Sequence, residues 1–447
     1  MKKFLALMAI MTFSLAQASS FKTERWQTSK GARVVFYKAM DVPMLYVNVA
    51  FAAGSAYDGN QFGISALTAE LLDQGNGNLN SSQIAEKLAD VGAQYNNETS
   101  RDMAVLQLKT LTEQDALTQA VDALSLIINK PTFRQDAFNR QKNQQLIAIA
   151  KDQESPDEVA NIVFFNKLYQ NHPYAHAING NTASVRALTV KQIRDFYSRY
   201  YVGNNAVIVL VGAIDSEKAH QIAEQLTQGL PKGEAAAAIP KAPRERRRED
   251  VMVAYPSSQN SLRLGQIGIS HADPDYFPLM VGNYILGGGS LVSRLSQEVR
   301  EKRGLTYGIS SQFIPMPGDG PFIISLSTKN NQTTTALQLT EETLASFLAT
   351  GPTGDELMAA KQYMVGSYPL SLASNGNIAG ILLRTTFYHL PEDYLDTYIA
   401  RVENVSLADI KKAFDSHIQQ DSMLLVSVGA EPPSANKDGK PNTNKPT

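Results

Sequence analysis

The chain has 447 residues, of which 43% are hydrophobic and 19% are charged, and its formal net charge is −2. This balance is typical of a globular protein, and the length predicts two or more domains. The near-neutral charge argues against a nucleic-acid-binding surface, and the absence of cysteine excludes disulfides, thiolate catalysis and cysteine-bound zinc.

The first 18 residues have the pattern of a secretory signal peptide. Lys2 and Lys3 precede an apolar run, residues 4–16, and an Ala-Gln-Ala sequence supplies the small residues of a cleavage site. We therefore expect the mature chain to begin near Ser19 and to work outside the cytoplasm, in the periplasm. The apolar run is too short to cross a bilayer comfortably and no later stretch is long enough, so we expect no membrane span.

The first half of the chain mixes strand and helix patterns. Short apolar or alternating runs predict strands, and apolar residues three and four apart predict helices. The predicted strands are 34–37, 45–52, 103–109 and 206–212, and the predicted helices are 62–72, 82–91, 113–128, 134–152 and 157–169. Because strands cluster early and helices follow, we expect an α+β fold with helices packed on one face of a mainly antiparallel sheet.

The helix expected within residues 63–76 occupies a place where metal ligands could stand. Two histidines four residues apart would share a helix face and could bind zinc, with an acid between them as general base. The chain has Ala66, Ala69 and Glu70 here, and no histidine precedes His172. Since catalytic zinc needs about three protein ligands, we expect no metal site in this chain.

Residues 232–250 separate the two halves. Prolines, an alanine run and a cluster of charged side chains predict an exposed linker between a first domain, residues 19–231, and a second domain, residues 251–430. The arginines of the linker could form a docking patch, although neighbouring acids favour a solvated segment. Residues 431–447 are rich in Pro, Asn and Lys, which predicts a disordered tail.

Residues 293–308 predict an amphipathic helix that ends at Gly304 and leads into a strand. Arg300 and Tyr307 are the candidate catalytic residues of this segment. Two structural roles remain open: Arg300 could be a last-turn cation opposing the helix dipole, and Tyr307 a half-buried strand aromatic. The preceding Gly287, Gly288 and Gly289 predict a turn.

The two halves resemble each other in sequence. DVGAQY at 90–95 parallels KRGLTY at 302–307, and residues 188–197 parallel residues 405–414. Each of the latter segments is followed by a buried-strand pattern ending in glycine, 206–212 and 423–429. The common order and spacing of these matches indicate a duplicated domain.

At these residues the chain resembles the pitrilysin-type metallopeptidases (family M16), in particular the short bacterial type with two domains. The resemblance runs from about Phe21 to Gly429. It rests on FAAGSAYDGNQFGISALTAELL and HPYAHAINGN in the first half and on NYILGGGSLVSRLSQEVREKRGLTYGI in the second. It implies two homologous α+β domains with the LuxS/MPP-like metallohydrolase fold.

The resemblance also implies which of the family's catalytic groups this chain has and which it lacks. The inverted zinc motif of the family, His-x-x-Glu-His, would fall at Ala66, Ala69 and Glu70, and a further glutamate ligand would fall near Gln141. The family's second-domain arginine and tyrosine fall at Arg300 and Tyr307. In active members this pair is thought to hold the scissile carbonyl opposite the zinc.

The glycines of the second half have a counterpart in related processing peptidases. Gly287, Gly288 and Gly289 lie where the non-catalytic subunit of those enzymes has a glycine-rich loop implicated in substrate capture. We treat these three glycines as candidate substrate-binding residues.

These features predict the non-zinc subunit of a heterodimeric peptidase. Arg300 and Tyr307 would serve a partner with an intact His-x-x-Glu-His, which would hold the zinc and cleave extended peptides. The chain alone would be inactive and would carry no cofactor. The alternative is a catalytically inactive peptide-binding or structural assembly protein of the same fold.

Overall fold

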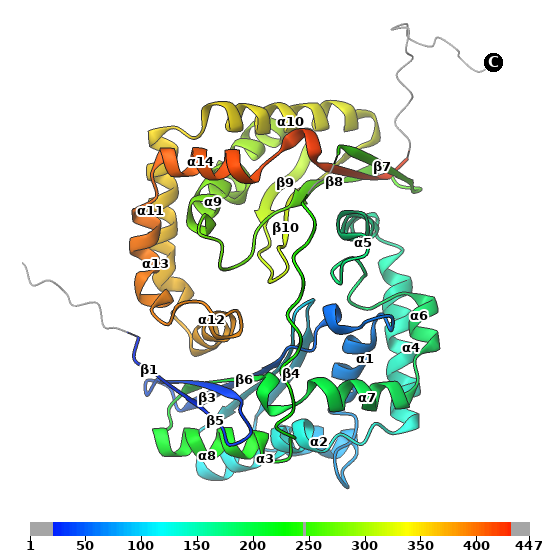
Figure 1. Ribbon diagram of the computed structural model, residues 1–447, viewed down its shortest axis with the longest axis vertical. Coiled ribbons are helices and arrows are strands. Elements are labelled where there is room, and N and C mark those ends of the chain that lie inside the picture. Colours follow the sequence, from blue (N-terminus) through cyan, green and yellow to red (C-terminus); the bar gives the residue numbers. More distant parts are fainter. Residues whose placement is uncertain (1–20, 245–246, 431–447) are drawn as a thin grey trace, which may run out of the picture.

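The computed structural model describes residues 21–244 and 247–430, in which two β-sheets each carry their own layer of helices (Figure 1). The predicted signal peptide and the predicted C-terminal tail lie outside the described residues. Within the described ranges, no helix combines the length and the apolar character needed to cross a membrane.

The first sheet has six strands in the order β1-β2-β6-β3-β5-β4. Neighbouring strands are antiparallel except β2 and β6, which run parallel. The strands are β1 (Thr23–Gln27), β2 (Arg33–Lys38), β3 (Met44–Phe51), β4 (Gln94–Thr99), β5 (Ala104–Leu111) and β6 (Ala206–Gly212).

The second sheet repeats this arrangement without the first strand, in the order β7-β11-β8-β10-β9. Only β7 and β11 are parallel, as β2 and β6 are in the first sheet. The strands are β7 (Glu249–Ala254), β8 (Gln259–Ile267), β9 (Thr306–Phe313), β10 (Pro321–Lys329) and β11 (Leu424–Gly429). The shared strand order confirms the predicted duplication and the mainly antiparallel α+β fold.

The helices lie close to their predicted positions, and many begin at side-chain caps. The first half contains α1 (Ile64–Leu71), α2 (Ser81–Ala89), α3 (Gln114–Asn129), α4 (Gln135–Asp152), α5 (Pro156–Tyr169), α6 (Thr182–Ala187), α7 (Val190–Tyr200) and α8 (Ser216–Thr227). The second half contains α9 (Tyr276–Asn283), α10 (Thr333–Thr350), α11 (Gly354–Ser371), α12 (Asn375–Phe387), α13 (Tyr394–Glu403) and α14 (Leu407–His417). Reciprocal capping boxes start α2, α6, α7, α11 and α14, which satisfies amide groups left free by the first helical turn.

Short helical turns complete the described part of the chain. They are η1 (Ser55–Tyr57), η2 (Gly203–Asn205), η3 (Tyr284–Gly288), η4 (Ser290–Val292), η5 (Ser296–Glu301), η6 (Asn330–Gln332) and η7 (Gln420–Ser422). Two of these, η3 and η5, are π-helical, and each packs against β9.

Each sheet is covered on its second face by one helix from the other half. Helix α5 packs on β8 and β11, and α12 packs on β3 and β6 (Figure 1). The central strand β6 is therefore buried on both faces: Ile208 and Leu210 join the core of the first half, while Val207 and Val209 meet α12. This explains why the strand sequence is continuously apolar instead of alternating.

Most described residues of the linker are exposed, but side-chain pairs join it to the second half. Strand β7 begins at Glu249, inside the predicted linker. Lys241 and Arg244 both pair with Asp319, which is buried in the second half. Arg248 pairs with Glu341 at 2.7 Å. The charged cluster therefore attaches the described part of the linker to the second half.

Candidate functional site

The positions of the missing zinc ligands lie together in the fold. Ala66 and Glu70 of α1 and Gln141 of α4 line one cavity of about 340 Å³. Ala69 is 2% exposed, and its carbonyl oxygen accepts a hydrogen bond from Asn97 Nδ2 at 2.9 Å. The fold thus retains the place of the site although its side chains have changed.

The donor set of this cavity does not fit zinc. Besides Glu70 and Gln141, its polar lining residues are Thr99, Gln144, Gln145 and Asn179. Burial raises the pKa of Glu70, and the nearby charge of Asp73 raises it further. Zinc in proteins is bound by thiolate, imidazole and carboxylate ligands, and one carboxylate among neutral amides is too few. No catalytic step in this chain is assigned to zinc.

The start of α1 is fixed by a buried carboxylate. Asp58 accepts hydrogen bonds from the amides of Gly63 at 2.6 Å and Ser65 at 3.1 Å. His176 stacks on Phe62, and its Nδ1 lies 3.9 Å from Asp58. Burial raises the pKa of Asp58 to about 7, although the hydrogen bonds to its oxygens oppose the shift. His176 lies in a bend between α5 and α6.

Arg300 lies near the end of the π-helical turn η5. Its Nε is 3.5 Å from Glu301 Oε1, and its side chain is 39% exposed. Gly304 adopts the left-handed conformation, with φ 61°, directly after the turn. Its amide donates to the carbonyl of Arg300 at 2.8 Å, and the amide of Leu305 donates to Val299 at 3.1 Å. The helix therefore stops where the sequence predicts, but with a widened last turn.

Tyr307 is presented to solvent by a β-bulge. On β9, Tyr307 and Gly308 together face the single residue Ser327 of β10, so the register shifts there. Thr306 Oγ1 lies 2.7 Å from the carbonyls of Gly308 and Ser327 and accepts from the Gly308 amide at 3.1 Å. Tyr307 is 85% exposed. Since bulges re-aim side chains and occur beside active sites, this geometry suits a residue that acts on another molecule.

The three glycines form a helical turn rather than an open loop. Gly287 belongs to η3, and a Cβ there would lie 2.4 Å from Ser311 Oγ. A Cβ on Gly289 would lie 2.7 Å from the carbonyl oxygen of Tyr284. Gly287 and Gly289 are therefore explained by close packing, and Gly288 is exposed.

A histidine–carboxylate cluster was missed at the sequence level. His417 Nε2 lies 3.0 Å from Asp275 and 3.7 Å from Asp273, and the three side chains could together hold a metal ion. Asp273 also accepts from the amide of Asp275. These contacts join the end of α14 to the start of α9. His417 is 142 or more positions from the two aspartates, so spacing alone could not reveal the cluster.

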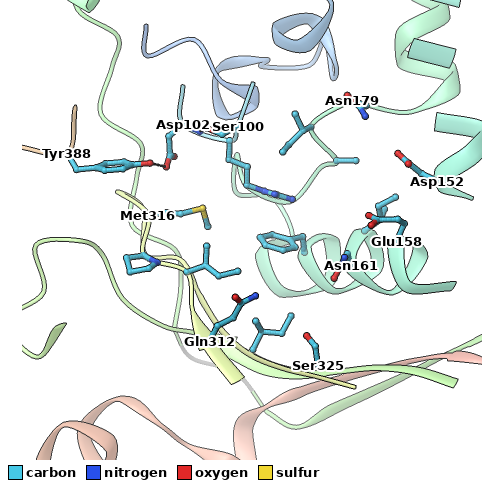
Figure 2. Close-up of a pocket in the computed structure, with 18 residues that line it drawn as sticks. Ser100, Asp102, Asp152, Glu158, Asn161, Asn179, Gln312, Met316, Ser325 and Tyr388 are labelled. Carbon is cyan, nitrogen blue, oxygen red and sulfur yellow. Dashed lines mark hydrogen bonds between the residues drawn. The ribbon is translucent and has the colours of Figure 1, made fainter. Parts of the chain in front are cut away.

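A second cavity lies where the two halves meet, and Figure 2 shows its lining residues. On one side, Asp102 accepts hydrogen bonds from the hydroxyls of Tyr174 at 2.7 Å and Tyr388 at 3.0 Å. Burial raises the pKa of Asp102, against the effect of these hydrogen bonds. Because Tyr388 belongs to the second half, this carboxylate links the halves. The local signal in the sequence is the charged pair Arg101-Asp102, directly before the predicted strand 103–109.

Two family models match the chain. The model described as "Insulinase (Peptidase family M16)" matches residues 33–182, and the model described as "Peptidase M16 inactive domain" matches residues 187–364. The residues that line the cavity around Glu70 and Gln141 all lie in the first match. Arg300 and Tyr307 lie in the second match.

Similar proteins include both inactive and unassigned relatives. The "Non-peptidase homolog YmxG" of Helicobacter pylori is 26% identical over 436 residues, covering 96% of this chain and 98% of that protein. The "Uncharacterized zinc protease YmxG" of Bacillus subtilis is 27% identical, covering 79% of this chain and 85% of that protein. The crystal structure of a peptidase M16 inactive domain from Pseudomonas fluorescens is 38% identical, with a TM-score of 0.89, and covers 92% of this chain and 99% of that one.

Proposed function

The chain belongs to the insulinase-type peptidases of family M16, and we propose that it is the non-zinc subunit of a periplasmic peptidase built from two different chains. The partner would carry the intact His-x-x-Glu-His, the zinc and the water-activating glutamate. This chain would contribute Arg300, Tyr307 and part of the peptide-binding surface. Among its relatives, one is named a non-peptidase and a solved structure is named an inactive domain, which supports the absence of independent activity.

The observation that carries the proposal is the contrast between two sets of catalytic positions. The zinc positions are filled by Ala66, Ala69 and Glu70. Arg300 and Tyr307 are retained, and both side chains are accessible, on a π turn and a β-bulge. Short π-helical segments are frequent at functional sites. An exposed arginine and tyrosine with no metal in their own chain make chemical sense as groups offered to another subunit.

The chemistry of the pair is transition-state stabilisation. A guanidinium and a phenol both donate hydrogen bonds to a carbonyl oxygen that gains negative charge during peptide hydrolysis. Removing one such donor typically lowers the rate on the order of a hundredfold. Gly288, exposed beside the buried Gly287 and Gly289, would offer backbone groups to an extended peptide. Folded proteins would be excluded by an enclosed chamber between the subunits.

The test is reconstitution with a partner that has the same fold and intact zinc ligands. We expect peptide cleavage only when both chains are present, and a loss on the order of a hundredfold with Arg300→Ala or Tyr307→Phe. Arg303→Ala is the matched control, because Arg303 is a neighbouring exposed cation that pairs with Glu298 at 2.7 Å. Full cleavage by the partner with either variant would contradict the proposal.

The second candidate is a peptide-binding or assembly protein without any role in catalysis. It is favoured by the name of the Helicobacter pylori relative, a non-peptidase homolog, and by the cavity between the halves, whose lining combines apolar and polar side chains. This second candidate predicts that Arg300→Ala and Tyr307→Phe both bind peptides as the native chain does. It also predicts that no zinc-bearing partner gains peptidase activity from this chain.

A further inference from the structure

Arg101 is a cation whose charge the described part of the chain leaves largely unmatched. It lies in the turn between β4 and β5, with its guanidinium carbon 3.7 Å from the ring centroid of Phe165. Its Nε donates to the carbonyl of Tyr174 at 3.2 Å. The described residues give its two Nη groups no hydrogen-bond acceptor and no carboxylate at ion-pair distance. Four of its five N–H donors are therefore available.

The neighbouring carboxylate of Asp102 attracts Arg101 but makes no direct ion pair with it. Asp102 is 3% exposed, and its two oxygens accept from Tyr174 and Tyr388, one hydroxyl each. Burial lowers the pKa of Arg101 to about 10, so the group remains charged at neutral pH. Leaving a partly buried charge without a direct ion-pair partner is unfavourable, so a negatively charged ligand would stabilise this guanidinium.

Arg101 lines the cavity between the halves, which has a volume of about 520 Å³. Figure 2 shows the amides of Asn161, Asn179 and Gln312 and the hydroxyl of Ser325 around this cavity. Its apolar lining residues are Ile162, Phe165, Ile178, Ile314, Met316 and Ile323. Neutral donors and acceptors beside apolar walls suit the backbone of an extended peptide.

We propose that this cavity binds a carboxylate of an extended peptide, with Arg101 as the anchoring residue. The planar guanidinium fork matches a carboxylate and can bind it with two parallel hydrogen bonds, while Phe165 supports its face. Asp152 and Glu158 also line the cavity (Figure 2), and they would repel a doubly charged phosphate more than a singly charged carboxylate. The proposal rests on the peptide-binding role proposed above, but it requires neither the partner nor Arg300 and Tyr307.

The carboxylate could be the C-terminus of the peptide or the side chain of Asp or Glu. Three fluorescein-labelled pools of random decapeptides separate these sources. The first lacks Asp and Glu and has a free C-terminus, the second is its C-terminally amidated version, and the third is amidated with one fixed internal Glu. Binding to the mature chain alone is measured by fluorescence anisotropy at low salt, where charge pairing is least screened.

We expect the first pool, the third pool or both to bind at least tenfold more tightly than the second. Arg101→Gln should remove this preference and Arg101→Lys should retain part of it, because lysine keeps the charge without the planar fork. Arg384→Gln is the control, since Arg384 lines the adjoining cavity beside Tyr388 and should leave the preference intact.

Equal binding of all three pools to the native chain would overturn the proposal without any variant, even if Arg101→Gln does not fold. Retention of the full preference in a folded Arg101→Gln would overturn it as well. Because the assay uses the chain alone, loss of cleavage in Arg300→Ala with an unchanged preference would support both proposals. A preference without any cleavage by the pair would contradict only the proposed catalytic role.

Discussion

Both halves of the chain contain a helix that stops at a left-handed glycine and leads into an edge strand, but the two copies expose different side chains. In the first half α2 ends near Gly92 and leads into β4, and in the second η5 ends near Gly304 and leads into β9. Leu88 of the first copy, 6% exposed, stands where the second copy has Arg300, whose side chain is 39% exposed.

The two helix ends close differently. In the first copy the amide of Gly92 donates to Ala89 and that of Ala93 donates to Leu88, the pattern of a Schellman motif. In the second copy the corresponding bonds each reach one residue further back, to Arg300 and Val299. A π-helical turn has more residues per turn than an α-helix, so equivalent positions no longer face the same way.

The strands that follow these helix ends, β4 and β9, also differ in the exposure of their tyrosines. β4 pairs with β5 without interruption, and the hydroxyl of Tyr95 is buried without a hydrogen-bond partner among the described residues. β9 has the bulge that leaves Tyr307 exposed. Two local irregularities, a π turn and a bulge, thus accompany the change from a core-facing pair to a solvent-facing pair within one repeated unit.

The largest expected effect comes from placing an arginine at Leu88, the position of the first copy that is equivalent to Arg300. Leu88→Arg would put a charge among apolar neighbours such as Ile84 and Leu117, all in one core. We expect the free energy of unfolding to fall by about 3–5 kcal/mol, the typical cost of an uncompensated buried charge. Urea denaturation measures the change.

The reverse substitution is the control for this prediction. Arg300→Leu replaces a partly exposed side chain and should change the free energy of unfolding by no more than about 0.5 kcal/mol. If Leu88→Arg were equally mild, the first copy would be as open as the second, and the comparison would fail.

A second difference concerns how the first helix of each half begins. The buried Asp58 caps α1, whereas Asp275 makes no side-chain cap to α9 and contacts His417 instead. Because the pKa of Asp58 is raised from 3.8 to about 7 in the folded chain, the folded state binds an extra proton between these values. The contribution of Asp58 to the free energy of unfolding is therefore complete below about pH 4, and it is lost as the pH rises through 7.

The measurement is the difference in unfolding free energy between the native chain and Asp58→Asn from pH 4 to pH 8. We expect the native chain to lose on the order of a few kcal/mol relative to the variant, since each pKa unit corresponds to about 1.4 kcal/mol. Asparagine can replace only one of the two accepting oxygens, so a pH-independent offset between the two chains is expected and the slope with pH is the diagnostic quantity. A difference that stays constant with pH would show that Asp58 is ionised throughout this range.

The repeat, the α+β fold and most helices could be predicted because they depend on local patterns. Apolar periodicity gave β6 within its observed bounds and α4 within one residue. The strand β6 also looked fully buried, but what covers it could not be read, because α12 comes from a segment more than 160 residues later. Packing between distant segments leaves no local signature in one sequence.

The candidate site was predictable only in part. Family resemblance gave Arg300 and Tyr307, whereas their exposure depends on a π turn and a bulge that helix and strand propensities do not encode. Arg101 was missed because its proposed role depends on what surrounds it: Phe165 from α5 packs on its guanidinium, and it makes no direct ion pair with the described residues. A lone arginine in a predicted turn is ordinarily a solvated residue.

The smallest expected effect tests the bulge itself. Thr306 is 9% exposed, and its hydroxyl bridges Gly308 and Ser327 where the register shifts. Thr306→Val keeps the shape but leaves the Gly308 amide without this acceptor, so the free energy of unfolding should fall by about 1–2 kcal/mol. Cleavage in the reconstituted pair should fall with it, because Tyr307 would no longer be held outward.

The control is Gln94, at the equivalent place in β4, which is exposed and makes no bulge. Gln94→Val should therefore change the free energy of unfolding by no more than about 0.5 kcal/mol. If Thr306→Val left both stability and cleavage unchanged, the bulge would not depend on this hydroxyl, and the exposure of Tyr307 would need another cause.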